Sequence, residues 1–243
     1  DGWEPRSSWI LLRGVPQAAP LWTHDDLLSL CLTLDGEPLL VEPGAPAIGG
    51  STYQVFASIA SHSALRIAGE REPLRLSRET GPHEVAAEPR KQGIYLGASR
   101  DVWCHPEIPL RLTREVLFQP ERKRLTVRDR LEGTGEALLE SNLLLAPHLD
   151  LLMRGDMGCL IRGKRLQARI HPVFPGRFKY ALHKGRTQPF AGWLWSESSR
   201  AVPTQRLCYH CRLSLPACTY LWIGWEPGDT AAPRAEDMDR LFE

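Results

Sequence analysis

Three side chains in the first quarter of the chain have the chemistry of metal ligands: His24, Glu42 and His62. Two imidazoles and one carboxylate are a set that can bind zinc, with a fourth position left for water or another ligand. His62 stands at the entry to an apolar run, within Ser-Ile-Ala-Ser-His-Ser-Ala-Leu. The three residues are distant in sequence, so the elements around them decide whether they form one site.

A predicted hairpin joins two of these residues. Residues 27–34 and residues 38–41 form two apolar runs, and Asp35-Gly36 separates them. Both turn residues tolerate the positive φ of a type I′ turn, so the pattern predicts two strands connected by a tight turn. Because a hairpin brings its outer ends together, we expect His24 and Glu42 to be neighbours in space.

Each candidate also has a plainer interpretation. A histidine at a strand end is often a surface or hydrogen-bonded residue, and the chain has eight histidines. Asp25 and Asp26 could accept a hydrogen bond from an imidazole and fix its tautomer. Asp26 could equally do no more than cap the turn before the strand. The sequence leaves both alternatives open.

Trp22 is a candidate substrate-binding residue, two positions before His24. The face of an aromatic ring suits the apolar face of a sugar, so Trp22 could stack on a carbohydrate. It could also belong to the core, because the chain has eight tryptophans and they cannot all be functional.

The order of these residues resembles one family. The pattern His-x-Asp-Leu-Leu-Ser begins at His24, Gly-x-Pro-Leu-Leu-Val-acid-Pro-Gly begins at Gly36, and Ala-x-His-Ser begins at Ala60. Together these motifs are similar to the C-terminal domain of the heparinase II/III family, bacterial polysaccharide lyases that act on uronate-containing chains such as heparin, heparan sulfate and alginate. A weaker resemblance through residues 111–118, 125–133 and 143–148 extends it over most of the chain.

The resemblance implies a role for each matching position. In the family's His-x-His-x-Asp motif the second His binds zinc, and His24 occupies that position here. The family's other ligands are an Asp in Val-Asp-Pro-Gly and a later His, which correspond to Glu42 and His62. The longer acid keeps the charge and the oxygen ligand, so the resemblance implies a structural zinc held by all three residues.

Two further positions depart from the family pattern. The first His of the motif lies in the family's catalytic groove, and Trp22 replaces it here. The family's Arg shortly before the last ligand is also missing, and Ala57 stands there. Because the groove residues differ while the metal-type residues remain, the departure concerns catalysis more than fold. No catalytic residue is assigned in this chain.

The resemblance also implies that the chain is one domain of a larger enzyme. Residues 1–243 would form the family's C-terminal β-sandwich, and an N-terminal (α/α) toroid, which supplies much of the catalytic machinery, would be missing from the chain. The implied partners are that toroid and an anionic polysaccharide, and the parent protein would be periplasmic or secreted. The isolated chain is expected to be inactive.

Composition agrees with one large β domain. A chain of 243 residues falls in the range of single sandwiches, and its 42% hydrophobic content is ample for a core. The formal net charge of +1 gives no general attraction to nucleic acid or to a membrane surface. No apolar run of about 18 residues predicts a membrane span.

The six cysteines match no small disulfide framework. Cys208 and Cys211 lie in an alternating apolar run, where they would face opposite sides of a strand. We interpret them as ordinary buried thiols rather than as metal ligands.

The pattern of the whole chain indicates strands. Apolar and polar residues alternate in residues 110–118 and 125–131, which is typical of half-buried strands. Residues 43–53 are predicted to be a loop, and only residues 235–242 indicate a short helix. The predicted fold class is all-β, a large antiparallel β-sandwich of jelly-roll-like type with little helix.

Two function classes remain. The first is part of a polysaccharide lyase, and the second is a catalytically degenerate module that binds glycan or supports a partner domain. Basic clusters at residues 122–124 and 162–165 could attract a polyanionic glycan. Each cluster also lies at a predicted turn, where solvated charge is expected in any case.

Overall fold

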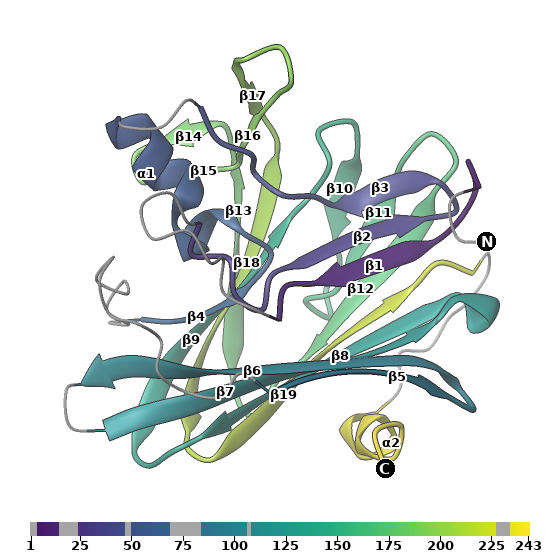
Figure 1. Cartoon of the computed structure of the whole chain (residues 1–243), viewed down its shortest axis with the longest axis vertical. Helices are drawn as coiled ribbons and strands as arrows, with labels where there is room; N and C mark the ends of the chain where they lie inside the picture. Colours follow the sequence, from purple (N-terminus) through teal and green to yellow (C-terminus); the bar gives the residue numbers. More distant parts are fainter. Residues whose placement is uncertain (1–3, 15–23, 47–49, 69–83, 106–107, 227–233) are drawn as a thin grey trace.

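Figure 1 shows a computed structural model of the chain, which describes residues 4–14, 24–46, 50–68, 84–105, 108–226 and 234–243. Nearly all regular structure in these ranges is antiparallel strand, and the two α-helices found there have only seven and five residues. The predicted all-β sandwich with little helix is therefore confirmed. No helix within the described residues is long and apolar enough to cross a membrane.

The largest layer is an eight-stranded antiparallel sheet. Its strands lie in the order β10 (Asp150–Met153), β11 (Cys159–Arg162), β12 (Gln167–Val173), β19 (Ala217–Gly224), β8 (Arg124–Glu132), β7 (Ile108–Gln119), β6 (Gly93–His105) and β5 (Val85–Arg90). Helix α2 (Ala235–Asp239) packs on the outer side of this sheet, where Met238 is buried against Tyr220 and Trp222 (Figure 1).

The facing layer is built from two smaller sheets. One has four strands, β13 (Phe178–Lys184), β18 (Gln205–Ser214), β9 (Glu136–Leu144) and β4 (Leu65–Ile67). The other has three, β1 (Trp9–Leu12), β2 (Leu30–Leu34) and β3 (Glu37–Leu40). A bridge between Leu40 and Leu145, just past the end of β9, joins the two sheets edge to edge.

The remaining elements of the described residues are short. They are helix α1 (Ser51–Ala57), the 3-10 turns η1 (Ile59–Ser61) and η2 (Pro120–Arg122), and the small two-stranded pairs β14 (Arg186–Thr187) with β15 (Phe190–Ala191) and β16 (Trp193–Trp195) with β17 (Ala201–Pro203).

One hydrophobic core lies between the layers and contains side chains from all three sheets, including Leu32, Val116 and Leu207. Every second residue of β18 enters this core, as the alternating sequence pattern predicts. Cys211 faces the core and Cys208 faces the other side, both as buried free thiols. The predicted burial of the two thiols and their opposite orientations are confirmed.

The predicted hairpin is present, with one correction at its start. Asp35 and Gly36 have φ of 49° and 79°, as a type I′ turn requires. The first strand begins at Leu30, because Leu28 turns the chain with a left-handed φ of 63°. The predicted strand over residues 27–34 was therefore three residues too long.

Helix α1 was not expected from the sequence. Helix α1 begins at Ser51, so residues 51–53 of the predicted loop over residues 43–53 are helical instead. The helix has no side-chain cap bond at Gly50 and no charged residue in either terminal turn. Its usual sequence signals are thus missing, and packing through the buried side chains of Tyr53 and Phe56 accounts for it.

The turn end of the hairpin is anchored by Glu37. Its buried carboxylate accepts hydrogen bonds from the backbone N–H groups of Lys164, Arg165 and Leu166, and it bonds His148 Nε2 at 2.8 Å. Burial alone would raise the pKa of Glu37, but these donors outweigh burial and hold its pKa below the usual value. The carboxylate therefore ties β3 to the loop between β11 and β12.

We predict that Glu37→Gln lowers the free energy of unfolding by about 3 kcal/mol at neutral pH, because buried N–H donors lose a charged acceptor. The pKa of Glu37 is lower in the folded state than in the unfolded state. Its contribution to the free energy of unfolding is therefore fully present above the unfolded-state pKa and is lost as the pH falls through the folded-state pKa. Urea unfolding at pH 7 and at pH 3 should show that wild type loses more stability on acidification than Glu37→Gln. An equal loss in both proteins would contradict this role.

Candidate metal centre

The structure brings the three predicted ligands together at the open end of the hairpin. Glu42 follows β3, and His62 follows η1 and precedes β4. His62 Nδ1 lies 2.5 Å from Glu42 Oε2, and the ring centroids of His24 and His62 are 5.3 Å apart. His62 is fully buried, whereas the Glu42 side chain is 36% exposed. His62 is thus the link between the other two residues.

Glu42 is held as a carboxylate by several donors. Its Oε1 accepts hydrogen bonds from Ser29 Oγ at 2.9 Å and from the Cys31 thiol at 3.4 Å. Burial alone would raise the pKa of Glu42, but the hydrogen bond and charge of His62, followed by Ser29 and Cys31, outweigh it and lower the pKa. Burial and the neighbouring Glu42 raise the pKa of Cys31, so its thiol stays protonated.

His24 has the protonation state that a metal needs. Burial and then the nearby His62 lower the pKa of His24, and the opposing charge of Glu42 compensates only in part. A neutral imidazole is the form that coordinates metal ions. The ring of Tyr53, from α1, meets the His24 ring edge-on with centroids 5.8 Å apart. Sequence reasoning missed Tyr53 because it did not predict α1.

Both acids beside His24 contact neighbouring segments. The Asp26 carboxylate lies 3.5 Å from Arg13 Nε, and the Asp26 carbonyl accepts the backbone N–H of Ser29 in the turn. The backbone N–H of Asp25 donates to the carbonyl of Ala57 at the end of α1. Asp26 therefore shapes the turn before β2, and its described ion pair is with an arginine rather than a histidine.

A buried ion pair positions the segments that carry the histidines. Arg114 on β7 lies opposite Asp129 on β8, and two guanidinium nitrogens bond the two carboxylate oxygens at 2.7 and 2.9 Å. The third nitrogen, Nη1, donates to the carbonyls of Leu28 at 2.7 Å and Ser63 at 3.1 Å. Ser63 follows His62 directly, so one guanidinium fixes both segments to the large sheet.

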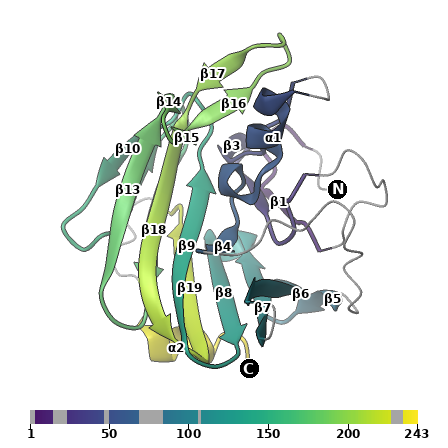
Figure 2. The same cartoon turned by 90° about the vertical axis from the view of Figure 1, so that its left-hand side faces the viewer.

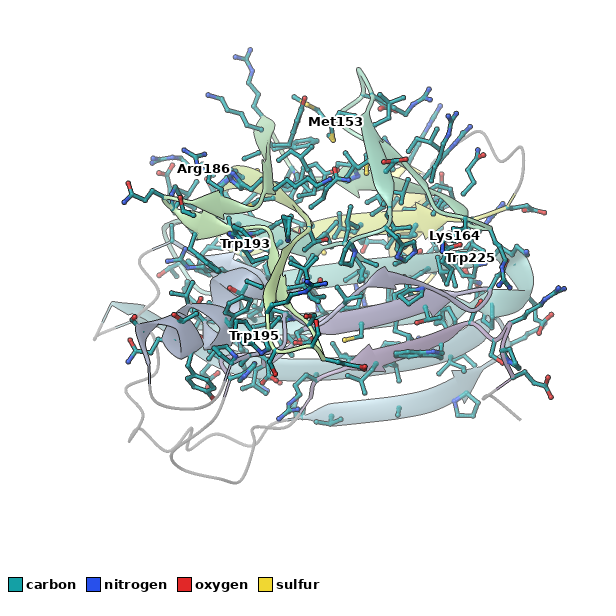
Figure 3. The ribbon with its side chains drawn as sticks, turned by 90° about the horizontal axis from the view of Figure 1, so that it is seen from above. Met153, Lys164, Arg186, Trp193, Trp195 and Trp225 are labelled. Atoms are coloured by element: carbon teal, nitrogen blue, oxygen red, sulfur yellow. The ribbon has the colours of Figure 1, made fainter. Side chains whose placement is uncertain are left out.

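An aromatic cluster supports the other side of the centre. The backbone N–H of Trp195 donates to the carbonyl of Pro43, the residue after Glu42, at 2.6 Å. Phe56 of α1 contacts Phe190 and Trp195 edge-on at centroid distances of 5.3 and 5.8 Å. Figure 3 shows Trp195 on the side of the molecule that carries α1. The cluster thereby holds α1 against the segment that carries Glu42.

The donor chemistry of this cluster fits a metal ion. His62 Nε2 is buried and has no hydrogen-bond partner within the described residues, His24 is neutral and Glu42 is ionised. The geometry, however, is that of a hydrogen-bonded His62–Glu42 pair. Within the described ranges, no group of three His, Cys, Asp or Glu side chains has its donor atoms placed to hold a metal.

The remaining candidates are placed as follows. Trp22 lies outside the described residues, so its predicted role in sugar stacking stays a prediction. Ala57 is buried at the end of α1, where its side chain offers no charge.

A protein-family model described as heparinase II/III-like, C-terminal, matches residues 7–214 of this chain. No curated protein sequence matches this chain.

Several solved structures have a similar fold. Heparan sulfate lyase HepC from Pedobacter heparinus has 13% identity and a TM-score of 0.70, over 94% of this chain and 34% of that one. A heparinase III described as the BT4657 gene product has 10% identity and a TM-score of 0.72, over 92% and 34%. A further heparinase III has 14% identity and a TM-score of 0.70, over 95% and 35%. The chain spans about a third of the length of each.

We predict that Arg114→Leu lowers the free energy of unfolding by about 3–5 kcal/mol, because it leaves Asp129 as an uncompensated buried charge. As a matched control, Arg212→Leu removes an exposed pair with Glu136 and should cost less than about 1 kcal/mol. Urea unfolding of the two variants gives the comparison. Similar losses in both would show that the Arg114 pair is not a structural anchor.

Proposed function

The chain belongs to the family of heparinase II/III-like C-terminal domains, and from this premise we propose that it is the C-terminal domain of a polysaccharide lyase. The proposed reaction is cleavage of uronate-containing glycans by β-elimination. The observation that supports it is the convergence of His24, Glu42 and His62 at one end of the hairpin. All three lie inside the region that the family model matches.

The proposed reaction sets requirements that this chain meets only in part. β-Elimination needs a base for the proton beside the uronate carboxylate, an acid for the departing glycosidic oxygen, and a group that neutralises the carboxylate. We place the acid and base mainly on an N-terminal toroid domain of a longer parent protein. The present chain contributes one wall of the cleft, with Trp22 as a surface on which a sugar ring stacks. The parent protein is proposed to be periplasmic or secreted.

We propose zinc as the ion of the candidate metal centre, held by His24, Glu42 and His62. The neutral His24, the ionised Glu42 and the unpartnered Nε2 of His62 support this assignment. Bound zinc supplies a structural cross-link between three separate segments. In this role it orders the loops that face the cleft and does not activate water.

A second candidate function is a catalytically degenerate module that binds glycan without cleaving it, or that only supports its partner domain. The observation that favours it is Ala57, whose buried methyl group stands where the resemblance expects an arginine. The change of a groove histidine to Trp22 favours it as well.

We expect about one zinc per chain in the purified protein, and loss of that zinc in His24→Ala. Elemental analysis after gel filtration measures it. His171→Ala serves as the matched control, because His171 lies on β12, outside the cluster, with its Nδ1 3.8 Å from Asp156 Oδ2. Zinc at 100 times its dissociation constant should stabilise the fold by about 2.7 kcal/mol, and chelation should remove that gain. Wild-type chain that holds no zinc after zinc is supplied would exclude the proposed site.

The lyase proposal makes a separate prediction for the parent protein. The full-length protein should convert a uronate-containing polysaccharide to unsaturated products, while the present chain alone should be inactive because it lacks the acid and base. Product absorbance of the unsaturated uronate provides the assay. Full-length protein that retains glycan without forming unsaturated product would support the degenerate module instead.

A further inference from the structure

The outer face of the four-stranded sheet carries an unusual arrangement of charge. In β18 the residues at odd positions enter the core, so Arg206, Cys208, His210 and Arg212 point outward. The same alternation applies to the neighbouring strands β13, β9 and β4. In Figure 2 this face is turned toward the viewer, and no labelled element lies in front of β13 and β18.

One row of side chains crosses all four strands. Lys179 on β13 pairs with His210 on β18, which pairs with Glu140 on β9, which pairs with Arg66 on β4. Glu140 Oε2 accepts a hydrogen bond from Arg66 at 3.1 Å, and Glu140 Oε1 lies 3.9 Å from His210. The acid is therefore shared between two basic neighbours, and Lys179 remains at the edge of the row.

A row of smaller side chains lies next to it, made of Ala181, Cys208 and Asn142. Beyond these, His183 stands opposite Arg206. Arg206 donates to Asn142 Oδ1 through two nitrogens, at 2.6 and 3.1 Å. Neighbouring residues on one face of a strand are about 7 Å apart. Cys208 and Asn142 are nevertheless buried, so the solvent-facing surface here is formed by the flanking basic side chains.

Positive charge on this face exceeds negative charge. Its cations are Arg66, Lys179, Arg206 and Arg212, and its acids are Glu136 and Glu140. Glu136 and Glu140 bond Arg212 and Arg66. Within the described part of the chain, Lys179 and Arg206 have no carboxylate partner.

The charges of this face affect the pKa of His183, which lies on the same face. Burial lowers the pKa of His183, and the charges of Arg206, Arg186 and His210 lower it further. Like charges opposite each other across strands are destabilising. The lowered pKa favours the neutral form of His183, so the positive charge at this position of the face is that of Arg206.

We propose that the outer face of β13, β18, β9 and β4 binds a stretch of anionic polysaccharide, with its acidic groups against Lys179 and Arg206. The class of ligand rests on the proposed function, whereas the site itself rests on the charge of the face. β4 begins three residues after His62, so one chain segment connects this face to the candidate metal centre. Two contact regions on one long polymer raise the overall affinity.

The test is retention of the 243-residue chain on immobilised heparin, a sulfated uronate-containing polysaccharide, with uncharged dextran beads as the reference. Lys179→Gln/Arg206→Gln should lower the affinity by about tenfold and lower the slope of log affinity against log salt by about 1–2. The matched control Lys91→Gln/Arg154→Gln removes the same charge from two exposed loops of the large sheet, between β5 and β6 and between β10 and β11, and it should retain the wild-type affinity.

Two checks keep the result decisive. Because Arg206 bonds the buried Asn142, Lys179→Glu alone provides a variant with an exposed, unpaired side chain, and it should also weaken binding. Unchanged retention in the sheet variants, or an equal loss in the loop control, would overturn the proposal.

The outcome is separable from that of the metal centre. The sheet variants should weaken heparin binding by the same factor in chelated protein and in the His24→Ala background as in untreated protein. If zinc is absent but retention follows the sheet variants, only the proposed metal site fails. If zinc is present and the sheet variants bind normally, only this inference fails.

Discussion

The guanidinium of Arg114 connects the parts of the molecule that matter for function. Two of its nitrogens donate hydrogen bonds to Asp129 within the large sheet, and the third donates to the backbone carbonyls of Leu28 and Ser63. Both charged side chains are 3% exposed, so the pair cannot exchange its partners for water. Leu28 keeps a left-handed φ that a leucine seldom adopts. The contact with Arg114 helps to hold it there, and the position of the histidine segments depends on the same contact.

The β2–β3 hairpin is fixed at both ends by charge. At the turn, the Glu37 carboxylate accepts hydrogen bonds from backbone N–H groups of the loop after β11. The Asp35 carboxylate accepts a hydrogen bond from Lys123 Nζ at 2.8 Å. At the open end, Glu42 bonds His62 and Ser29. The hairpin therefore has little freedom to slide or tilt against the sandwich. A site built at such an end keeps its geometry because the supporting strands are rigid.

Local chemistry explains which features the sequence could predict. The residue types of Asp35 and Gly36 are sufficient to predict the turn. The alternation of apolar and polar residues in β18 predicts that Cys208 and Cys211 face opposite sides of the strand, and Cys211 is the one that enters the core. Helix α1 carries no comparable signal, because it depends on tertiary contacts of Phe56 and Tyr53 rather than on caps. The pairing of His62 with Glu42 crosses twenty residues of chain. Spacing along the chain cannot predict that contact, and only the family resemblance indicated it.

The hydrogen bond between His62 and Glu42 also affects how a metal ion can bind at this site. Glu42 is one methylene longer than the aspartate of the family motif, and its Oε2 lies 2.5 Å from His62 Nδ1. This bond already links two of the three segments that zinc would join. A metal that takes Glu42 as a ligand has to replace that hydrogen bond, whereas one that binds at His62 Nε2 leaves it intact and gains a second-shell acceptor on the imidazole. In the proposed site Glu42 is a ligand, so zinc would have to compensate for the loss of this hydrogen bond when it binds.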